Sequence, residues 1–218
     1  MSDDLKTVYK KGIAAGFVIT IGCTIFLSAQ NAAAIAGAPV WWYTVCGAVA
    51  FCVGLYLVCG FGMNLFTGKI GYFLHPGSKM FYLHVWLGNL CGALIAALLV
   101  RIARADLTPV ASNLIDTKNA RSLLVLFAQA IMCGVLMYGA VDNYSRNRNM
   151  VGVCGLVFCV CAFILCGFEH SIANMGYVLI GLSSADQILP SLVMLLVVSL
   201  GNSVGAIAFD SLMQSKKQ

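Results

Sequence analysis

The chain has 218 residues, of which 61% are hydrophobic and only 10% are charged, with a net charge of +5. Soluble domains carry about 25% charged residues, so this composition excludes a soluble globular protein and indicates an integral membrane protein. No aromatic residues are interleaved with the basic ones, so we expect the positive charge to reflect topology and contact with a lipid membrane, with no nucleic acid as partner.

Apolar segments follow one another along most of the chain, and a helix needs about 20 such residues to cross the hydrocarbon core. The first run is long enough for two crossings, and Gly37-Ala38-Pro39 marks a turn between them. Because Glu169 and His170 lie between two later runs, we count those two runs as one interrupted crossing and predict six crossings in all. The runs are 12–68, 80–100, 122–141, 149–168, 171–185 and 187–209.

The distribution of basic residues predicts the orientation in the membrane. Three lysines precede the first crossing, and the following connection has none, so the positive-inside rule puts the N-terminus in the cytoplasm. Six crossings return the C-terminus to that side of a multi-pass protein of the cell membrane. The polar leader and the long apolar run after it favour a retained span over a cleaved signal peptide. Basic residues expected inside are Lys6, Lys10, Lys11, Lys79, Arg146, Arg148, Lys216 and Lys217; those expected outside, against the rule, are Arg101, Arg104, Lys118 and Arg121.

The ten cysteines lie almost entirely within apolar segments and show no CxxC spacing. We therefore expect them to behave as small hydrophobic residues rather than as disulfides or metal ligands. The three histidines, His75, His84 and His170, have no ligand spacing either. No metal and no cofactor are expected, and a membrane redox enzyme is disfavoured.

Two landmarks recur in the same order along the chain. Cys59-Gly60-Phe61 and Cys166-Gly167-Phe168 each precede a polar interruption of the apolar sequence. Later in each half, residues 88–93 and 201–206 share the pattern G-N-x-x-G-A. The order of landmarks indicates an internal repeat.

Three crossings per half would give the two halves opposite orientations in the membrane. We therefore predict an all-α membrane protein with six transmembrane helices, arranged as an inverted 3+3 repeat in an aquaporin-like protomer with broken second and fifth helices. The halves would be about 12–101 and 118–211, within a single transmembrane channel domain at 1–218.

Each G-N-x-x-G-A segment places an asparagine amide in hydrocarbon, where it is costly unless it is hydrogen-bonded. We expect Asn89 and Asn202 to bind backbone groups freed at the helix interruptions, rather than to touch a substrate. Asn174 and Glu169, beside the second interruption, are grouped with them as support for the helix breaks. The glycines of these segments are expected mainly to permit close helix packing.

His170 lies between two apolar runs, at a depth where an ionisable residue is by default a candidate for function. A buried histidine that only hydrogen-bonds a neighbouring loop is the alternative. An interrupted backbone at this depth is tolerated only against protein or a water-filled cavity, which favours the functional interpretation. Glu169 would repel anions from a pore, so we expect it to be structural and to face backbone amides or a neighbouring subunit.

Thr67 ends the interruption in the first half and could offer its hydroxyl to His170 or to a solute. The half-helix that starts there would present free amides and a positive dipole end, and two such ends would favour anions. A capping role alone would also explain Thr67. Lys118, just before the fourth crossing, would by itself be read as a flanking residue whose ammonium reaches the interface.

Three motifs together resemble the formate/nitrite transporter family. They are G-F-E-H-S-I-A-N-M at 167–175, N-L-F-T-G at 64–68, and the paired G-N-x-x-G-A segments. The resemblance covers residues 12–209 with the landmarks in the family's order. It implies an aquaporin-like protomer and a homopentamer with one pore per protomer.

The resemblance also implies roles for single residues. The family's central histidine falls on His170, its loop threonine on Thr67 and the lysine at the start of the fourth span on Lys118. These three would form the substrate pathway.

The family's apolar constrictions find matches as well. Phe51 and Leu55 fit one side of the inner constriction and Phe163 the other, and Leu65 falls near the outer constriction.

Some positions depart from the family's pattern. Asn64 stands where an acidic residue usually precedes L-F-T, and Gly134 stands where an asparagine is usual in the fourth span. The N-terminal amphipathic helix of the family would be reduced to residues 2–11.

From these residues we predict a channel or transporter for small monovalent anions of weak acids, namely formate, nitrite or hydrosulfide, and not an enzyme. Lys118 and the half-helix ends would attract the anion. A proton delivered at His170 and Thr67 would give the neutral acid, which crosses an apolar constriction more easily than an ion does. The alternative is an aquaporin-like pore for small neutral solutes, which the apolar constrictions favour and the positive lining disfavours.

Overall fold

The computed structural model describes residues 4–214, and the elements it shows there are helices. Ser2, Lys216 and Lys217, which entered the sequence interpretation, lie outside the described residues. Lys6, Lys10 and Lys11 belong to the first turns of one long helix that starts at Leu5. The expected short N-terminal helix at 2–11 is therefore wrong for the described residues, because the helical chain continues without a break into the first apolar run.

Five helices are long and apolar enough to cross a membrane, by length and composition. Large apolar side chains, such as Leu98, Met132 and Leu196, are exposed on them. Exposed apolar surface of this kind is expected to face lipid or another protein. The five are α1 (Leu5–Ala36), α2 (Val40–Gly60), α4 (Met80–Ala103), α6 (Leu123–Arg146) and α9 (Ile188–Met213, which continues from the 3-10 turn η3 at Ala185–Gln187).

The predicted fifth crossing is divided between two shorter apolar helices. They are α7 (Met150–Leu165), with 16 residues, and α8 (Ser171–Gly181), with 11. Neither alone reaches the length of a membrane crossing. The chain leaves the helix at 166–170, the segment in which Glu169 and His170 also interrupt the apolar sequence.

The remaining elements are short. The single turn α3 (Phe66–Lys69) follows α2 and leads into η1 (Ile70–Leu74). Residues between the two predicted halves form η2 (Ala105–Leu107) and α5 (Thr108–Asn119), which the sequence interpretation did not assign.

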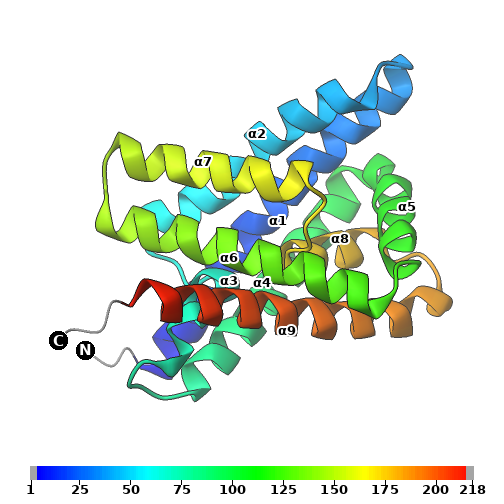
Figure 1. Cartoon of the computed structure of the whole chain (residues 1–218). Helices are drawn as coiled ribbons and strands as arrows, with labels where there is room; N and C mark the ends of the chain where they lie inside the picture. The colour runs from blue at the N-terminus through cyan, green and yellow to red at the C-terminus, as the bar shows by residue number, and fades with distance from the viewer. Residues whose placement is uncertain (1–3, 215–218) are drawn as a thin grey trace.

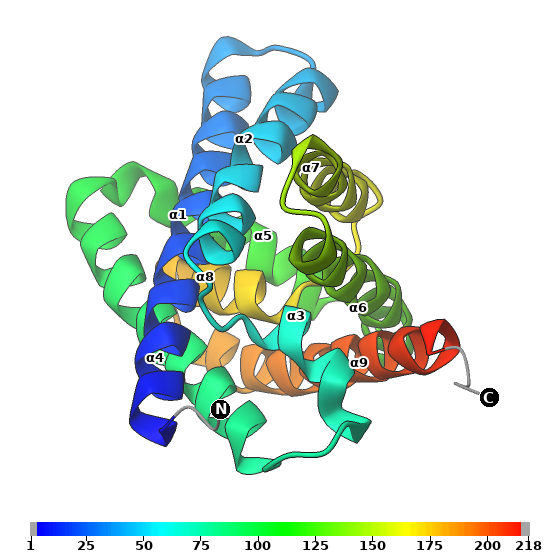
Figure 2. The same cartoon turned by 90° about the vertical axis from the view of Figure 1, so that its left-hand side faces the viewer.

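The long helices pack in two corresponding groups. Helix α1 packs against α2 and α4, helix α6 packs against α7 and α9, and α2 meets α7 between the groups. Figure 1 shows both chain ends at one end of the bundle and α5 at the other. Figure 2 shows the α1–α2 hairpin extending beyond the rest of the molecule; the first turn of α2 carries the exposed Trp41 and Trp42.

Glycines set the close approach of two helix pairs. A Cβ on Gly16 would lie 1.9 Å from the Asn89 carbonyl oxygen, and one on Gly134 would lie 2.2 Å from that of Asn202. Both are far below van der Waals contact with rigid backbone. Gly134, where the family usually has asparagine, therefore has a structural reason in this chain: it lets α9 approach α6 as closely as α4 approaches α1.

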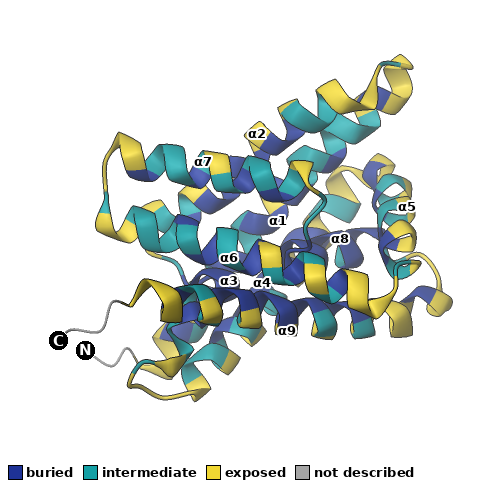
Figure 3. Ribbon diagram, viewed as in Figure 1, coloured by how far each residue is buried: buried dark blue, intermediate teal, exposed yellow. Residues whose placement is uncertain are grey.

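The short helices lie at the centre. Helix α8 is buried along nearly its whole length, and Phe66, Thr67 and Gly68 of α3 are buried too. Figure 3 shows these central segments as buried and the exposed residues at the ends and outer faces of the long helices. The long helices thus enclose the two interruptions.

Candidate functional site

The chain leaves α2 and α7 through the same kind of turn. Gly62 and Gly167 have positive φ values of 62° and 66°, which glycine adopts without strain. The following residue in each turn donates its N–H to a carbonyl five residues back, from Met63 to Val58 at 2.8 Å and from Phe168 to Phe163 at 2.9 Å. Gly62 thus corresponds to Gly167, and the sequence pairing of the two C-G-F segments is wrong by two residues.

Asn89 of α4 holds the start of α3. Its Oδ1 accepts the N–H of Phe66 at 2.9 Å, and its Nδ2 donates to the carbonyls of Gly12 and Asn64, both at 2.8 Å. One fully buried amide thereby links α1, α4 and the first interruption.

Asn202 of α9 does the same at the second interruption. Its Oδ1 accepts the N–H of Ser171 at 2.9 Å, and its Nδ2 donates to the carbonyls of Ala130 and Glu169, both at 2.8 Å. The first N–H of each short helix therefore already has an acceptor. The expectation of free amides at the helix starts is wrong for these two N–H groups, because each is bound by an asparagine oxygen.

His170 and Thr67 meet between the two interruptions. The imidazole Nε2 lies 3.0 Å from the Thr67 hydroxyl oxygen, and both side chains are buried. The other ring nitrogen, Nδ1, accepts the N–H of Ala173 at 2.9 Å and so caps α8. In a neutral ring with Nδ1 as acceptor, Nε2 carries the hydrogen and donates it to Thr67.

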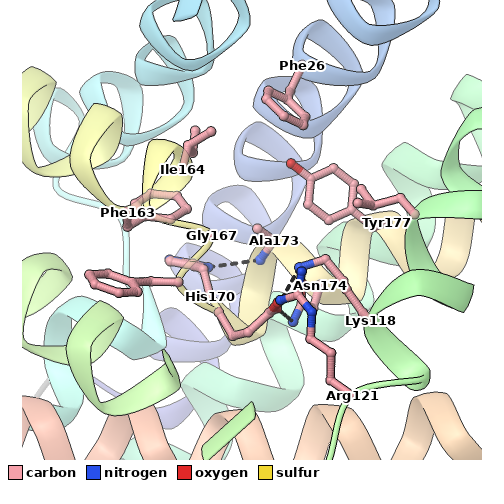
Figure 4. A pocket seen from close by; sticks show the side chains of 13 residues that line it. Phe26, Lys118, Arg121, Phe163, Ile164, Gly167, His170, Ala173, Asn174 and Tyr177 are labelled. Atoms are coloured by element: carbon pink, nitrogen blue, oxygen red, sulfur yellow. Dashed lines mark hydrogen bonds and ion pairs between the residues drawn. The ribbon is translucent and has the colours of Figure 1, made fainter. Parts of the chain in front are cut away.

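Glu169 is the centre of a buried ion-pair cluster. Its carboxylate accepts from Lys118 at 2.6 Å, from Arg121 at 2.8 Å and from Asn174 at 2.8 Å. Glu169 is fully buried and Lys118 is 9% exposed. Figure 4 shows Lys118, Arg121 and Asn174 converging on one carboxylate.

This cluster corrects two expectations. The Glu169 carboxylate faces cationic side chains and an amide of the same chain, not backbone amides or a neighbouring subunit. Lys118 is not an exposed flanking residue, because its ammonium is turned inward. A buried carboxylate needs such partners, since desolvation of an unpaired charge is expensive.

Two cavities reach the interruptions from opposite sides. The Lys118 cavity, of about 120 Å³, extends to His170 and has Phe26, Phe163 and Tyr177 on its walls (Figure 4). The Lys69 cavity, of about 90 Å³, extends to Leu65 and also includes Lys69.

The four residues assigned to constrictions are all buried. Phe51 and Phe163 make an edge-to-face contact with ring centroids 5.9 Å apart, and Leu55 lies one turn beyond Phe51 on α2. Phe163 lines the cavity of Lys118, whereas Leu65 lines the opposite one. Phe163 and Leu65 thus line different cavities, and their assignment to the inner and the outer constriction stays a prediction.

Sequence reasoning missed two residues. Arg121 was used only in the topology argument, although its spacing of three from Lys118 puts both near the end of α5, facing one carboxylate. Lys69 was counted only as part of an interruption. A lysine five residues after Asn64, inside an apolar sequence, was the available signal.

The chain matches known proteins over nearly all of its length. The family model for formate/nitrite transporters matches residues 1–215. The nitrite transporter NirC of Escherichia coli (strain K12) is 31% identical over 138 residues, and the match spans 57% of this chain and 52%, about half, of that relative. The formate channel FocA of the same organism is 28% identical over 198 residues, or 84% of this chain and 68% of FocA.

Solved structures agree in fold. A pentameric formate channel with formate bound superposes with a TM-score of 0.80 at 25% identity, covering 95% of each chain. An ion channel of the same family gives a TM-score of 0.84 at 24% identity, covering 94% of this chain and 88% of the other, which shows the fold alone. These relatives are channels and transporters rather than enzymes, and they disfavour the alternative of a neutral-solute pore. The chain belongs to the formate/nitrite transporter family and is a multi-pass membrane protein.

Proposed function

We propose that this protein conducts small monovalent anions of weak acids, with formate and nitrite as first candidates and hydrosulfide as a third. The observation that carries the proposal is the buried contact of His170 Nε2 with the Thr67 hydroxyl, at the inner end of the Lys118 cavity. Both groups can donate a hydrogen bond to an anion that inserts between them. The N-terminal end of α8, capped by His170, adds a positive dipole at the same point.

Proton coupling through His170 would require a second proton on the ring, and only Nδ1 is open to it. Ala173 N–H must then leave Nδ1, so charging the ring would release the cap of α8. We propose that the charged ring passes its Nε2 proton to the anion, which leaves a neutral ring with its hydrogen on Nδ1. The capped form returns when Nδ1 loses that proton and Nε2 takes up another. The neutral acid would then cross the apolar stretch between Phe163 and Leu65 at lower cost than the ion.

We further propose that the chain crosses the membrane six times as an inverted 3+3 repeat with halves at about 12–101 and 118–211. The broken second crossing would be α2 with α3, and the broken fifth would be α7 with α8. The matching hydrogen bonds of Asn89 and Asn202 support this arrangement. By analogy with the pentameric formate channel, the assembly would be a homopentamer with one pore per protomer.

The proposed orientation has both termini in the cytoplasm of a cell membrane. The basic residues that opposed the positive-inside rule are engaged within the protein, which supports this orientation. Arg101 donates to the carbonyls at the end of α8, Arg104 pairs with Asp106, and Lys118 and Arg121 pair with Glu169. Basic residues that are paired within the protein are placed by the fold, so they do not count against this orientation.

Flux into proteoliposomes tests the function. Formate, nitrite and hydrosulfide should each be compared at external pH 5 to 8, with glycerol swelling as the neutral-solute control. Selective, pH-sensitive anion flux is expected. Glycerol flux without anion flux, from protein verified as inserted, would contradict the proposal.

Two His170 variants separate proton transfer from simple hydrogen bonding. His170→Asn keeps a side-chain acceptor that can cap α8 but cannot be protonated, and His170→Phe removes both properties. If proton transfer is required, both variants lose the pH-dependent flux. If His170 is only a hydrogen-bonding group, His170→Asn should retain most of it.

A further inference from the structure

The Lys69 cavity contains two cations and no carboxylate. Lys69, the last residue of α3, is half-buried, and Arg148, between α6 and α7, is exposed. Within residues 4–214, neither side chain has a hydrogen bond or an ion pair with a protein group.

The Lys118 cavity is balanced differently. There Glu169 neutralises part of the charge of Lys118 and Arg121. The residue that corresponds to Glu169 in the first interruption is Asn64, because the carbonyl of each accepts a hydrogen bond from the supporting asparagine. The carboxylate is therefore replaced by a neutral amide on the Lys69 side.

A second exchange lies five residues further along the chain. Asn174 follows Glu169 and donates to it, whereas Lys69 follows Asn64. Replacing a carboxylate by an amide removes one negative charge, and replacing an amide by an ammonium adds one positive charge. The pair of Asn64 and Lys69 thus carries two more positive charges than the pair of Glu169 and Asn174. No carboxylate of residues 4–214 forms an ion pair with Lys69 to offset the cost of burying its charge.

We propose that Lys69 and Arg148 bind a small monovalent anion, a carboxylate or an inorganic anion such as nitrite, in the Lys69 cavity. The ammonium and guanidinium supply charge-assisted donors, and the hydroxyl-bearing Tyr144 and Ser145 also line the cavity. A volume of about 90 Å³ suits an anion of a few heavy atoms.

The role of this site in transport rests on the proposed function, because the bound anion would lie at the end of the proposed pathway opposite Lys118. The Lys69 cavity extends to Leu65, the residue next to the hydrogen-bonded Phe66 and Thr67. An anion held there would raise the occupancy of this mouth and so favour entry from this side.

Anion binding can be tested without transport. Crystals of the full chain soaked in bromide should show anomalous density between Lys69 Nζ and the Arg148 guanidinium, and Lys69→Gln should lose it while Lys69→Arg keeps it. Equal density in wild type and Lys69→Gln would indicate an adventitious ion only. No density in the wild type would overturn the site, whether or not the protein conducts.

Flux tests the role in the pathway. Lys69→Gln should raise the half-saturating formate concentration about fivefold for entry from the Lys69 side, the scale of a partly exposed charge interaction. The matched control is Lys6→Gln, the same charge change at an exposed residue near the same end of the bundle. Equal values for the two variants would remove Lys69 from permeation. A wild type that binds bromide but conducts no anion would instead overturn the proposed function.

Discussion

The two helix interruptions use the same backbone support but carry different chemistry. In both, a left-handed glycine ends the longer helix and a buried asparagine holds the first N–H of the shorter one. The residue that precedes the shorter helix is Leu65 in one interruption and His170 in the other. Backbone N–H and carbonyl groups need hydrogen-bond partners in both interruptions. A polar side chain before the shorter helix is present only at His170.

The difference shows which features are structural and which are free to specialise. The asparagines and glycines are matched because they solve a problem common to the two interruptions. Asn174 and Lys69 differ, because Asn174 lines only the Lys118 cavity and Lys69 lines only the other one. Glu169 and Asn64 differ as well, because Glu169 pairs with cations whereas Asn64 donates to the carbonyl of Val8. Substitutions at the matched positions should therefore have similar effects in both halves, and those at the unmatched positions should not.

The largest effect is expected where two helices meet at glycine. Gly16→Ala and Gly134→Ala each place a Cβ at about half of contact distance from backbone oxygen, so α4 or α9 would have to move. We expect both variants to fail to accumulate as folded protein, measured by size-exclusion chromatography in detergent. The control is Gly60→Ala, since a Cβ on Gly60 has no atom within 4 Å. Normal yield of either test variant would contradict the tight packing.

The next effect concerns the supporting asparagines. Asn89→Ala and Asn202→Ala should each lower the free energy of unfolding by about 2–6 kcal/mol, because each leaves one N–H and one carbonyl of the interruption without their partner, at about 1–3 kcal/mol per group. Denaturant unfolding in detergent measures this, with the exposed Asn113→Ala as control. A large loss for one variant and none for the other would show that the two interruptions are not supported alike.

A smaller effect should separate the cavities. Glu169→Gln leaves Lys118 and Arg121 without their carboxylate and should cost about 3–5 kcal/mol, as for other broken buried pairs. Adding Lys118→Met to this variant should recover part of the loss, because one of the two unpaired cations is removed. Adding Lys118→Met to Asn64→Gln, in the opposite interruption, should bring no such recovery of stability. Denaturant unfolding in detergent measures these changes. If Lys118→Met does not recover stability, the broken ion pair is not the cause of the loss in Glu169→Gln.

The exposed pair of Arg104 and Asp106 is the control for that measurement. The hydrogen bond from Arg104 lowers the pKa of Asp106 below its usual value. The pair's contribution to stability is therefore fully present above the pKa of Asp106 in the unfolded chain, about 3.9. It is lost only as pH falls through the lower pKa of Asp106 in the folded protein. Asp106→Asn should leave unfolding between pH 5 and 8 almost unchanged, since exposed pairs contribute little.

Much of the architecture could be predicted from the sequence because the signals are local. The apolar runs after the first predicted the helix ends within about five residues, and the turn at Gly37 to Pro39 separated the first two helices. The first run, 12–68, starts seven residues after α1 does and ends eight residues beyond α2. The polar interruptions and the asparagines also follow from one rule, that buried polar groups in hydrocarbon need partners. The family resemblance rested on contiguous motifs of the same kind.

Other features depended on residues that are far apart in sequence. The partners of Glu169 lie 48 and 51 residues away, and Thr67 lies 103 residues from His170. The register between the interruptions was misassigned because the same short motif, C-G-F, occurs at different points of the two turns. Only the folded chain decides such pairings.

What the sequence by itself determined is the membrane-embedded helical class, the order of the helices and the two places where they are interrupted, since these depend on the hydropathy of neighbouring residues. The tertiary structure decided the ion pairs of Glu169, the contact of His170 with Thr67 and the separation of the Lys118 and Lys69 cavities. The physical reason is that charge pairing and cavity shape depend on how separate helices pack, which local hydropathy does not specify.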